Sequence, residues 1–200
     1  MQKDISTKDQ IFNVALRLFA TTGVENASMR DIAENVGIKT ASIYNHFESK
    51  GQILEECYRF FENYRDELRL SQEQYLPILQ HGTKQEVVSA PNYDFPRDKI
   101  ENGIYSLMVT FSNVYIDARA REIYLALKRE AMAYLKEFFE TGIEIDRFLP
   151  FDHQPVSSLY LSVKLNAAHM VSVDPGGDDH LYEYQANMFH LFEHLIPFRY

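Results

Sequence analysis

The chain has 200 residues, a formal net charge of −9 and one cysteine, Cys57. Its length allows one large hydrophobic core or two small ones. The single cysteine excludes an intrachain disulfide, and the lack of a run of about 18 apolar residues excludes a transmembrane helix. Residues 1–13 also lack the apolar stretch of a signal peptide, so we expect a cytoplasmic protein without a membrane partner.

The net charge is unevenly distributed along the chain. Residues 1–50 contain six Lys/Arg and six Asp/Glu, whereas residues 51–200 contain 14 Lys/Arg and 23 Asp/Glu. Because binding to a polyanion requires cations, the overall acidity argues against nucleic-acid binding by the chain as a whole. The neutral N-terminal quarter is compatible with such a role for that part alone.

The first two predicted helices carry clear start and stop signals. One is expected to begin at Thr7 as its cap and to end before Gly23, with apolar residues recurring at helical spacing. The next begins at Ser28, which precedes Asp31 in the S-x-x-D spacing of a capping box. It ends at Gly37 after about two turns, because glycine readily adopts the left-handed conformation that follows a helix.

A third short helix is predicted over residues 39–47, and a fourth is expected to start at Ser49. Ile43 and Phe47 are four residues apart, so they share one face of the third helix and are expected to point into a small core. Two short helices joined around Gly37 and supported by the first form a helix-turn-helix. We therefore predict a helix-turn-helix domain over residues 1–50.

Residues 51–200 are also predicted to be helical, because helical periodicity dominates and few alternating strand patterns occur. Pro and Gly break residues 71–98 into short helices or loops, and Gly142 is expected to break a further helix. The longer helices are predicted over residues 98–116, 119–139, 156–173 and 180–196. The predicted fold class is all-α, with a three-helix N-terminal domain followed by a larger helical domain over residues 51–200.

The outward face of residues 39–47 has the composition of a helix that enters the major groove of DNA. Thr40, Ala41 and Ser42 are small, which allows close approach to a groove about 12 Å wide. Lys39 can donate to guanine, and Asn45 can pair with adenine. These two residues are therefore the expected base readers.

Five other side chains are candidates for contacts to DNA phosphates. Tyr44 is expected to pack its ring and direct its hydroxyl outward, and His46 is expected to donate as well. Lys50 lies at the start of the fourth helix, where free backbone amides also attract anions. Ser28 and Arg30 open the second helix, which crosses the DNA backbone in helix-turn-helix proteins, and Arg30 can reach either a phosphate or a guanine edge.

The segment ASMRDIAENVGIKTASIYNHFESKGQIL resembles the DNA-binding segment of the TetR/AcrR family of bacterial transcriptional regulators. The resemblance covers roughly residues 7–55 and includes the Phe19–Gly23 spacing, the DIA of the second helix, Gly37 and the pattern I-Y-x-H-F-x-S-K. It implies an all-helical homodimer that binds a palindromic operator and senses a small ligand with its C-terminal domain. The DNA contacts that it implies fall on Ser28, Arg30, Lys39, Thr40, Ser42, Tyr44, Asn45, His46 and Lys50.

The resemblance also indicates where a ligand would bind, since the pockets of the family form among the central helices of the C-terminal domain. Ligand pockets are mostly apolar and aromatic, and an acidic body would favour a hydrophobic or cationic aromatic effector through cation–π contacts. The candidate ligand-binding residues are Tyr105, Met108, Phe111, Tyr115, Tyr124, Met132 and Phe138.

The last two predicted helices are candidates for the dimer interface. The helix over residues 156–173 is apolar around most of its circumference, which is unusual for a helix with one solvent-exposed face. Pairing it with residues 180–196 across a two-fold axis gives a four-helix bundle. The candidate interface residues are Leu159, Val163, Ala167, Met170, Phe189 and Phe192.

The function predicted from these features is a ligand-responsive repressor that a small molecule releases from its operator, with no catalytic site and no cofactor. One alternative is a regulator that binds a protein coregulator and no small ligand. Another is a small helical metal-binding protein or enzyme built on His190 and His194, which are four residues apart with Glu193 between them, and on His169 as a third ligand. Paired histidines are more common at surfaces and interfaces, so no metal is expected.

Overall fold

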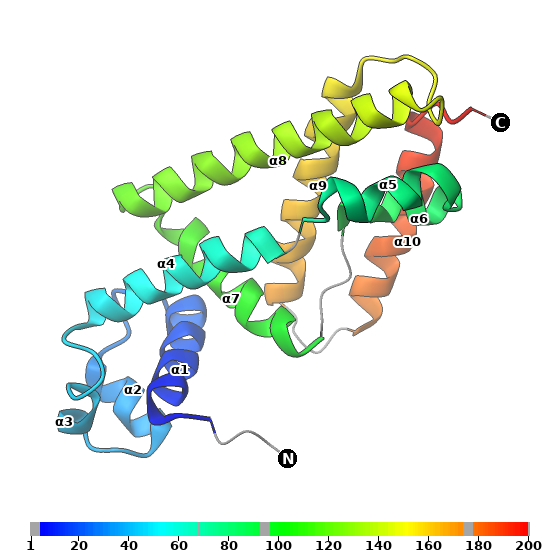
Figure 1. Ribbon diagram of the computed structural model, residues 1–200. Helices are drawn as coiled ribbons and strands as arrows, with labels where there is room; N and C mark the ends of the chain where they lie inside the picture. Colours follow the sequence, from blue (N-terminus) through cyan, green and yellow to red (C-terminus); the bar gives the residue numbers. More distant parts are fainter. Residues whose placement is uncertain (1–4, 68, 93–96, 174–177, 200) are drawn as a thin grey trace. The chain divides into compact units, whose positions relative to one another are not determined.

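A computed structural model describes residues 5–67, 69–92, 97–173 and 178–199; within these ranges the side-chain surroundings of residues 66, 67, 92, 97–100, 164 and 166–186 are not described. The described residues form ten α-helices and one short 3-10 helix (Figure 1), which confirms the predicted all-α fold. The elements are α1 Thr7–Thr22, α2 Met29–Val36, α3 Thr40–Ile43, α4 Lys50–Glu67, α5 Gln72–His81, α6 Lys84–Ser89, η1 Ala90–Asn92, α7 Arg97–Asn113, α8 Ala118–Glu144, α9 His153–Val173 and α10 Asp178–Leu195. No helix of the described part is both long and apolar enough to cross a bilayer.

The chain folds into two compact units. Unit 1 consists of residues 1–64 and 96–124, and unit 2 consists of residues 65–95 and 125–200. Each unit therefore combines segments that are distant in the sequence. We predicted a boundary after residue 50 between a DNA-binding part and a ligand-sensing, dimerising part. The compact units describe packing and not function, so this boundary stays a prediction.

Unit 1 contains the three predicted N-terminal helices. Ile11, Ala15, Leu16 and Phe19 of α1 are buried, as are Ile32 and Ala33 of α2. Helix α7 packs along α1, and Asn102 of α7 donates a hydrogen bond from its side-chain amide to Asn13 of α1 at 3.0 Å. On α4, Tyr58 donates its hydroxyl hydrogen to Asp117 at 2.9 Å. The three N-terminal helices are thus supported by two further helical segments of the same unit.

Three helix boundaries differ from the prediction. The cap of α1 is Ser6 and not Thr7, because the Ser6 hydroxyl oxygen accepts a hydrogen bond from the backbone of Asp9 at 3.1 Å. Helix α3 ends at Ile43, since the backbone N–H of His46 bonds to Ile43 at 2.8 Å in a tighter turn. Helix α8 continues through Gly142, where the ring of Phe148 lies against the glycine.

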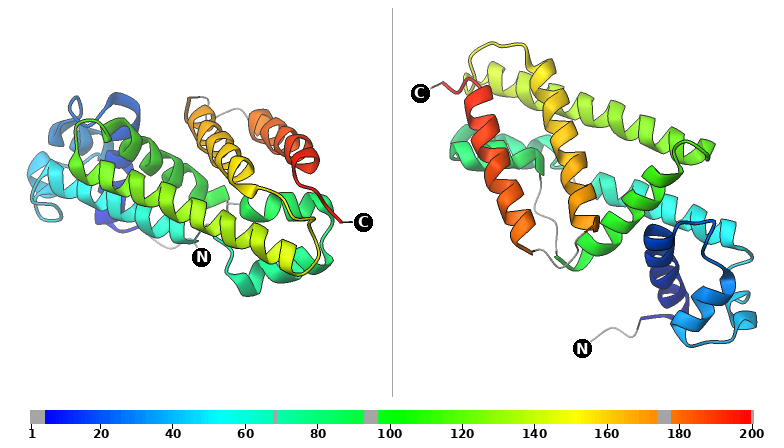
Figure 2. Two further views of the ribbon diagram at one scale, coloured as in Figure 1. Left: turned by 90° about the horizontal axis from the view of Figure 1, so that it is seen from above. Right: turned by 180° about the vertical axis from the view of Figure 1, so that it is seen from behind.

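Unit 2 has a core built from aromatic side chains. Tyr75 of α5 contacts Phe138 of α8 with a ring-centroid distance of 5.4 Å, and Tyr160 of α9 contacts Phe192 of α10 at 4.8 Å. Figure 2 shows α9 and α10 side by side, in agreement with the contacts between them. Phe148 belongs to the same core and contacts Phe138 and Phe139.

Candidate nucleic-acid interface

The geometry of the helix-turn-helix is set by local hydrogen bonds at the ends of α2. The Ser28 backbone N–H donates to the Asp31 carboxylate at 2.8 Å, and the Asp31 backbone N–H donates to the Ser28 hydroxyl oxygen at 3.2 Å. This is the predicted capping box, and hydrogen bonds from the Ser28 side chain and backbone hold the pKa of Asp31 below its ordinary value. At the other end, Gly37 has φ 80° and ψ 28°, a left-handed conformation that favours glycine.

Helix α3 presents one face to the core and the other to solvent. Ile43 and Phe47 are buried, and the Lys8 ammonium group lies 5.4 Å from the centroid of the Phe47 ring. This anchoring leaves Lys39 and Asn45 exposed. The inward and outward positions are those that the i, i+4 spacing predicted.

Among the other predicted contacts on this face, His46 is exposed, and Thr40 and Ser42 are half-buried. Ala41, which was predicted only to allow close approach, is exposed. Tyr44 is 54% exposed. Its ring is therefore not packed into the core, which corrects our expectation of a buried ring with only the hydroxyl outward. The exposed surface consists of small, amide, imidazole and phenol groups, which can donate to base edges and phosphates. The individual DNA contacts stay predictions.

Three of the predicted phosphate contacts have partners within the chain. The Lys50 ammonium group donates hydrogen bonds to the carbonyl oxygens of Val24 at 2.7 Å and Ala27 at 3.1 Å. Arg30 pairs with Glu34 at 2.8 Å, on the exposed surface. The Ser28 hydroxyl belongs to the capping box described above. A phosphate would have to share these groups with, or take them from, their present partners.

The seven candidate ligand-binding residues are divided between the two units. Phe111 and Tyr124, both in unit 1, touch edge to face with centroids 5.0 Å apart. Tyr115 is 88% exposed in the turn between α7 and α8, so it does not line an interior site. Of the remaining four, Tyr105 is buried, Met108 and Met132 are half-buried, and Phe138 is in the core of unit 2.

Two depressions occur in the described surface, and none of these seven residues lines either of them. A volume of about 330 Å³ lies beside Val14, Arg17 and Asn35 in unit 1. A larger one of about 640 Å³ lies in unit 2 beside Arg147 and Arg199. Sequence reasoning missed both, because each is lined by residues from separate segments that share no motif.

The candidate dimer residues lie in different environments. Leu159 is 38% exposed, and Val163 and Phe189 are half-buried. Phe192 is fully buried against Tyr160, so its side chain is not available to a partner, and this corrects its predicted place on the interface. The side chains of Ala167 and Met170 lie outside the described residues.

Two further leucines of α10 are exposed, and two histidines of the same helix lie near a carboxylate. Leu191 and Leu195 are each 40% exposed on α10, although sequence reasoning did not select them. His190 and His194 lie 3.2 and 3.7 Å from the Glu193 carboxylate. His169 is outside the described side chains, and within the described part no group of three or more ligating side chains is placed to hold a metal ion.

A capped α2, a left-handed glycine turn and an anchored α3 with an exposed polar face define a helix-turn-helix domain. Residues 11–57 match the family described as "Bacterial regulatory proteins, tetR family". This match over the N-terminal segment confirms the resemblance to that family seen in the sequence.

Curated relatives that match the same segment are also transcriptional regulators. The chain is 41% identical over 56 residues to the HTH-type transcriptional repressor KstR2 of Mycolicibacterium smegmatis, covering 28% of this chain and 27% of that protein. It is 40% identical over 60 residues to IcaR, the biofilm operon icaADBC HTH-type negative transcriptional regulator of Staphylococcus aureus, covering 28% of this chain and 32% of that protein. The match thus spans about a quarter to a third of the length of these relatives, which are transcriptional regulators rather than enzymes.

The fold resembles those of solved regulators over nearly the whole chain. The ketosteroid transcriptional regulator KstR2 of Mycobacterium tuberculosis has a TM-score of 0.69 and 18% identity, covering 98% of each chain. A putative transcriptional regulator from Saccharomonospora viridis in complex with choline has a TM-score of 0.66 and 17% identity, covering 96% of this chain and 98% of that chain. At these identities the likeness extends to the fold alone.

Proposed function

We propose that this protein is a homodimeric transcriptional repressor that binds a palindromic operator and is released from it by a small molecule. The observation that carries the proposal is the exposed polar face of residues 39–46, formed by α3 and the turn after it, which the buried Ile43 and Phe47 hold outward. In this proposal, residues 1–50 bind DNA, and residues 51–200 dimerise and sense the ligand.

The proposed base contacts are made by α3 in the major groove. Lys39 and Asn45 reach base edges, while Tyr44 and His46 donate to phosphates on either side. Thr40 and Ser42 add hydroxyl contacts where the helix lies closest to the groove. Ser28 and Arg30 lie at the start of α2, where a helix-turn-helix crosses the DNA backbone.

The proposed dimer contact uses the exposed leucines of α9 and α10. Leu159, Leu191 and Leu195 are large apolar side chains on two adjacent helices of unit 2. Removing such side chains from water favours association. A two-fold axis through this face would pair each leucine set with its copy, and an operator with matching symmetry would then be a palindrome.

The proposed effector is a hydrophobic or cationic aromatic compound. The chain has an acidic C-terminal part, and aromatic rings such as those of Phe111 and Tyr124 can bind cations over their faces. A structural neighbour was solved in complex with choline, which is a quaternary ammonium compound. An effector of this kind changes DNA affinity only by its differential affinity for the two states of the dimer.

A protein coregulator is a second candidate for the regulatory partner, on the basis of the turn between α7 and α8. Tyr115 and the adjacent Ile116 are both highly exposed, and Arg121 holds the turn by donating to the backbone carbonyls of Val114 and Tyr115. An ordered turn with two exposed apolar side chains suits a protein contact. A thermal-shift screen separates the two candidates, because a specific small ligand raises the apparent stability.

The test of DNA binding uses fluorescence anisotropy with duplexes that flank the gene for this protein. We expect salt-dependent binding that the double variant Lys39→Ala/Asn45→Ala weakens by about 1–3 kcal/mol per lost base contact. Lys128→Ala, an exposed lysine of α8, is the control and should bind as the parent does. Absence of salt-dependent binding, or equal binding by the double variant, would overturn the proposal.

A further inference from the structure

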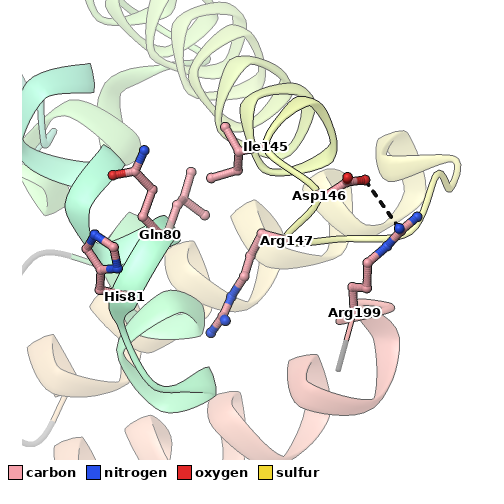
Figure 3. A pocket seen from close by; sticks show the side chains of 7 residues that line it. Gln80, His81, Ile145, Asp146, Arg147 and Arg199 are labelled. Carbon is pink, nitrogen blue, oxygen red and sulfur yellow. Dashed lines mark ion pairs between the residues drawn. The ribbon is translucent and has the colours of Figure 1, made fainter.

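A cleft of about 640 Å³ lies in unit 2, whereas every residue that we assign to DNA binding belongs to unit 1. The end of α5, the segment that follows α8 and the C-terminal segment meet there (Figure 3). Its polar walls include His81, Asp146, Arg147 and Arg199. Ile145 provides apolar surface in the same cleft, and the buried Leu79 lies behind it in the core.

The charge in this cleft is opposite to that of the chain. The net charge of the protein is −9, yet the cleft has two guanidinium groups and one imidazole against the single carboxylate of Asp146. Lys84 adds a further cation close by, because its ammonium group and the Arg147 guanidinium group lie 5.3 and 5.6 Å from the centroid of the same Phe198 ring. A local excess of cations attracts anions.

Arg147 is held in place before any ligand arrives. Its Nη2 atom donates a hydrogen bond to the carbonyl oxygen of Gly82 at 2.6 Å, and its guanidinium group rests on Phe198. Its Nε atom is buried and has no hydrogen-bond partner among the described residues. A buried donor without a partner is uncommon in folded proteins, and the Arg147 side chain is fixed by its contacts with Gly82 and Phe198.

Arg199 is the second cation, and its present partner can be displaced. Its Nη1 atom lies 3.5 Å from the Asp146 carboxylate, and both side chains are about half exposed or more. Exposed ion pairs of this kind contribute little to stability. Asp146 also has φ 62°, a left-handed conformation that is uncommon outside glycine, and such outliers cluster at binding sites.

We propose that this cleft binds a small organic carboxylate. The carboxylate group replaces Asp146 as the partner of Arg199 (Figure 3), since a guanidinium group matches the geometry of a carboxylate and donates charge-assisted hydrogen bonds to it. Arg147 adds a second positive charge to the wall of the same cleft. The apolar part of the ligand rests on Ile145, which is half-buried. The site is independent of the DNA-binding proposal, because all of its residues belong to unit 2.

The test is a titration of the isotope-labelled full chain with hexanoate, followed by the backbone amide signals of His81, Asp146 and Arg199. Inorganic phosphate at equal ionic strength is the comparison, because it carries charge without an apolar part. We expect saturable shifts with hexanoate and binding weaker by about tenfold or more with phosphate. Non-saturable shifts, or equal affinity for the two anions, would overturn the proposal.

Two variants with opposite expected effects test the residues. Arg199→Gln should weaken hexanoate binding by about tenfold or more, because it removes a charge-assisted hydrogen bond. Asp146→Asn should strengthen binding, because it removes the competing carboxylate while asparagine tolerates a positive φ. Arg129→Gln, at an exposed site on α8, should change nothing. Equal affinity in all three variants, or weaker binding by Asp146→Asn, would contradict the assignment.

Discussion

The ammonium nitrogen of Lys50 lies 2.7 Å from the carbonyl oxygen of Val24. It donates a second hydrogen bond to Ala27 at 3.1 Å, so the first residue of α4 holds the turn between α1 and α2. Val24 and Ala27 are both buried. The same ammonium group is one of the predicted phosphate contacts, and the two roles make different predictions.

We expect Lys50→Met to lower the free energy of unfolding by about 1.5–3 kcal/mol, because it removes hydrogen bonds from a charged donor to two carbonyl groups. Urea denaturation followed by circular dichroism measures this loss. Lys39→Met, at an exposed position of the same domain, is the matched control and should leave stability nearly unchanged. Equal stability of the two variants would show that the Lys50 hydrogen bonds do not support the fold.

DNA binding by the same variant separates the structural role from a phosphate contact. A lysine that contacts a phosphate reduces the slope of log affinity against log salt concentration by about 1 when it is removed. If Lys50 only holds the turn, Lys50→Met should lower affinity and leave that slope unchanged. A lower slope would support the phosphate contact and require the ammonium group to leave Val24 on binding.

Gly103 on α7 should be intolerant of a side chain, because an added Cβ atom would overlap the ring of Tyr64. We expect Gly103→Ala to lower the free energy of unfolding by about 1–3 kcal/mol through overpacking. Alanine otherwise favours a helix over glycine by about 1 kcal/mol. Gly51→Ala in α4 is the control, since its Cβ atom would meet only Ser49 at an ordinary 3.7 Å. Thermal denaturation should therefore move in opposite directions for the two variants.

Local signals in the sequence were sufficient to predict the helix-turn-helix. The capping box of Ser28 and Asp31 and the left-handed Gly37 depend on neighbours within a few residues, which a pattern in the sequence can represent. The prediction that glycine breaks the helix was wrong at Gly142, where α8 continues to Glu144. There the ring of Phe148, six residues further along the chain, packs against a glycine that intrinsic propensity alone would disfavour inside a helix.

The environment of the site residues was less predictable, because it depends on contacts between distant segments. Nothing near Lys50 in the sequence indicates that Val24 and Ala27 accept its hydrogen bonds. On α10, Phe192 and Leu191 are adjacent and both apolar, so composition could not tell which one is buried. The structure buries Phe192 and exposes Leu191. The cleft beside Arg147 and Arg199 likewise requires segments about 50 residues apart in the chain to meet.

Two capping boxes predict a pH dependence that can be assigned to individual residues. Hydrogen bonds from Ser28 lower the pKa of Asp31, chiefly through the serine side chain, and hydrogen bonds from Thr83 lower the pKa of Glu86, chiefly through its backbone. A lowered pKa means that the folded state favours the carboxylate. The resulting stability is present above the ordinary pKa of each group and is lost as the pH falls through the lowered pKa.

An NMR titration of the side-chain carboxyl groups checks this assignment. Ser28→Ala should raise the pKa of Asp31 and leave that of Glu86 unchanged. Thr83→Ala should raise only the pKa of Glu86, and by less, because its largest contribution comes from a backbone N–H that the variant retains. A shift of both carboxyl groups in either variant would indicate a general loss of structure and contradict the local explanation.

The exposed leucines of α10 provide a test of the proposed dimer. Leu191 and Leu195 are one helical turn apart and each 40% exposed, so both would be covered by a partner that packs on this face. Leu191→Glu/Leu195→Glu would place unpaired charges in the contact, and we expect it to raise the dimer dissociation constant by at least about 100-fold. Light scattering after size-exclusion chromatography should give twice the chain mass of 23.4 kDa for the parent and the single mass for the variant. Leu125→Glu, at an equally exposed position on α8, should remain dimeric, and a dimeric double variant would place the interface elsewhere.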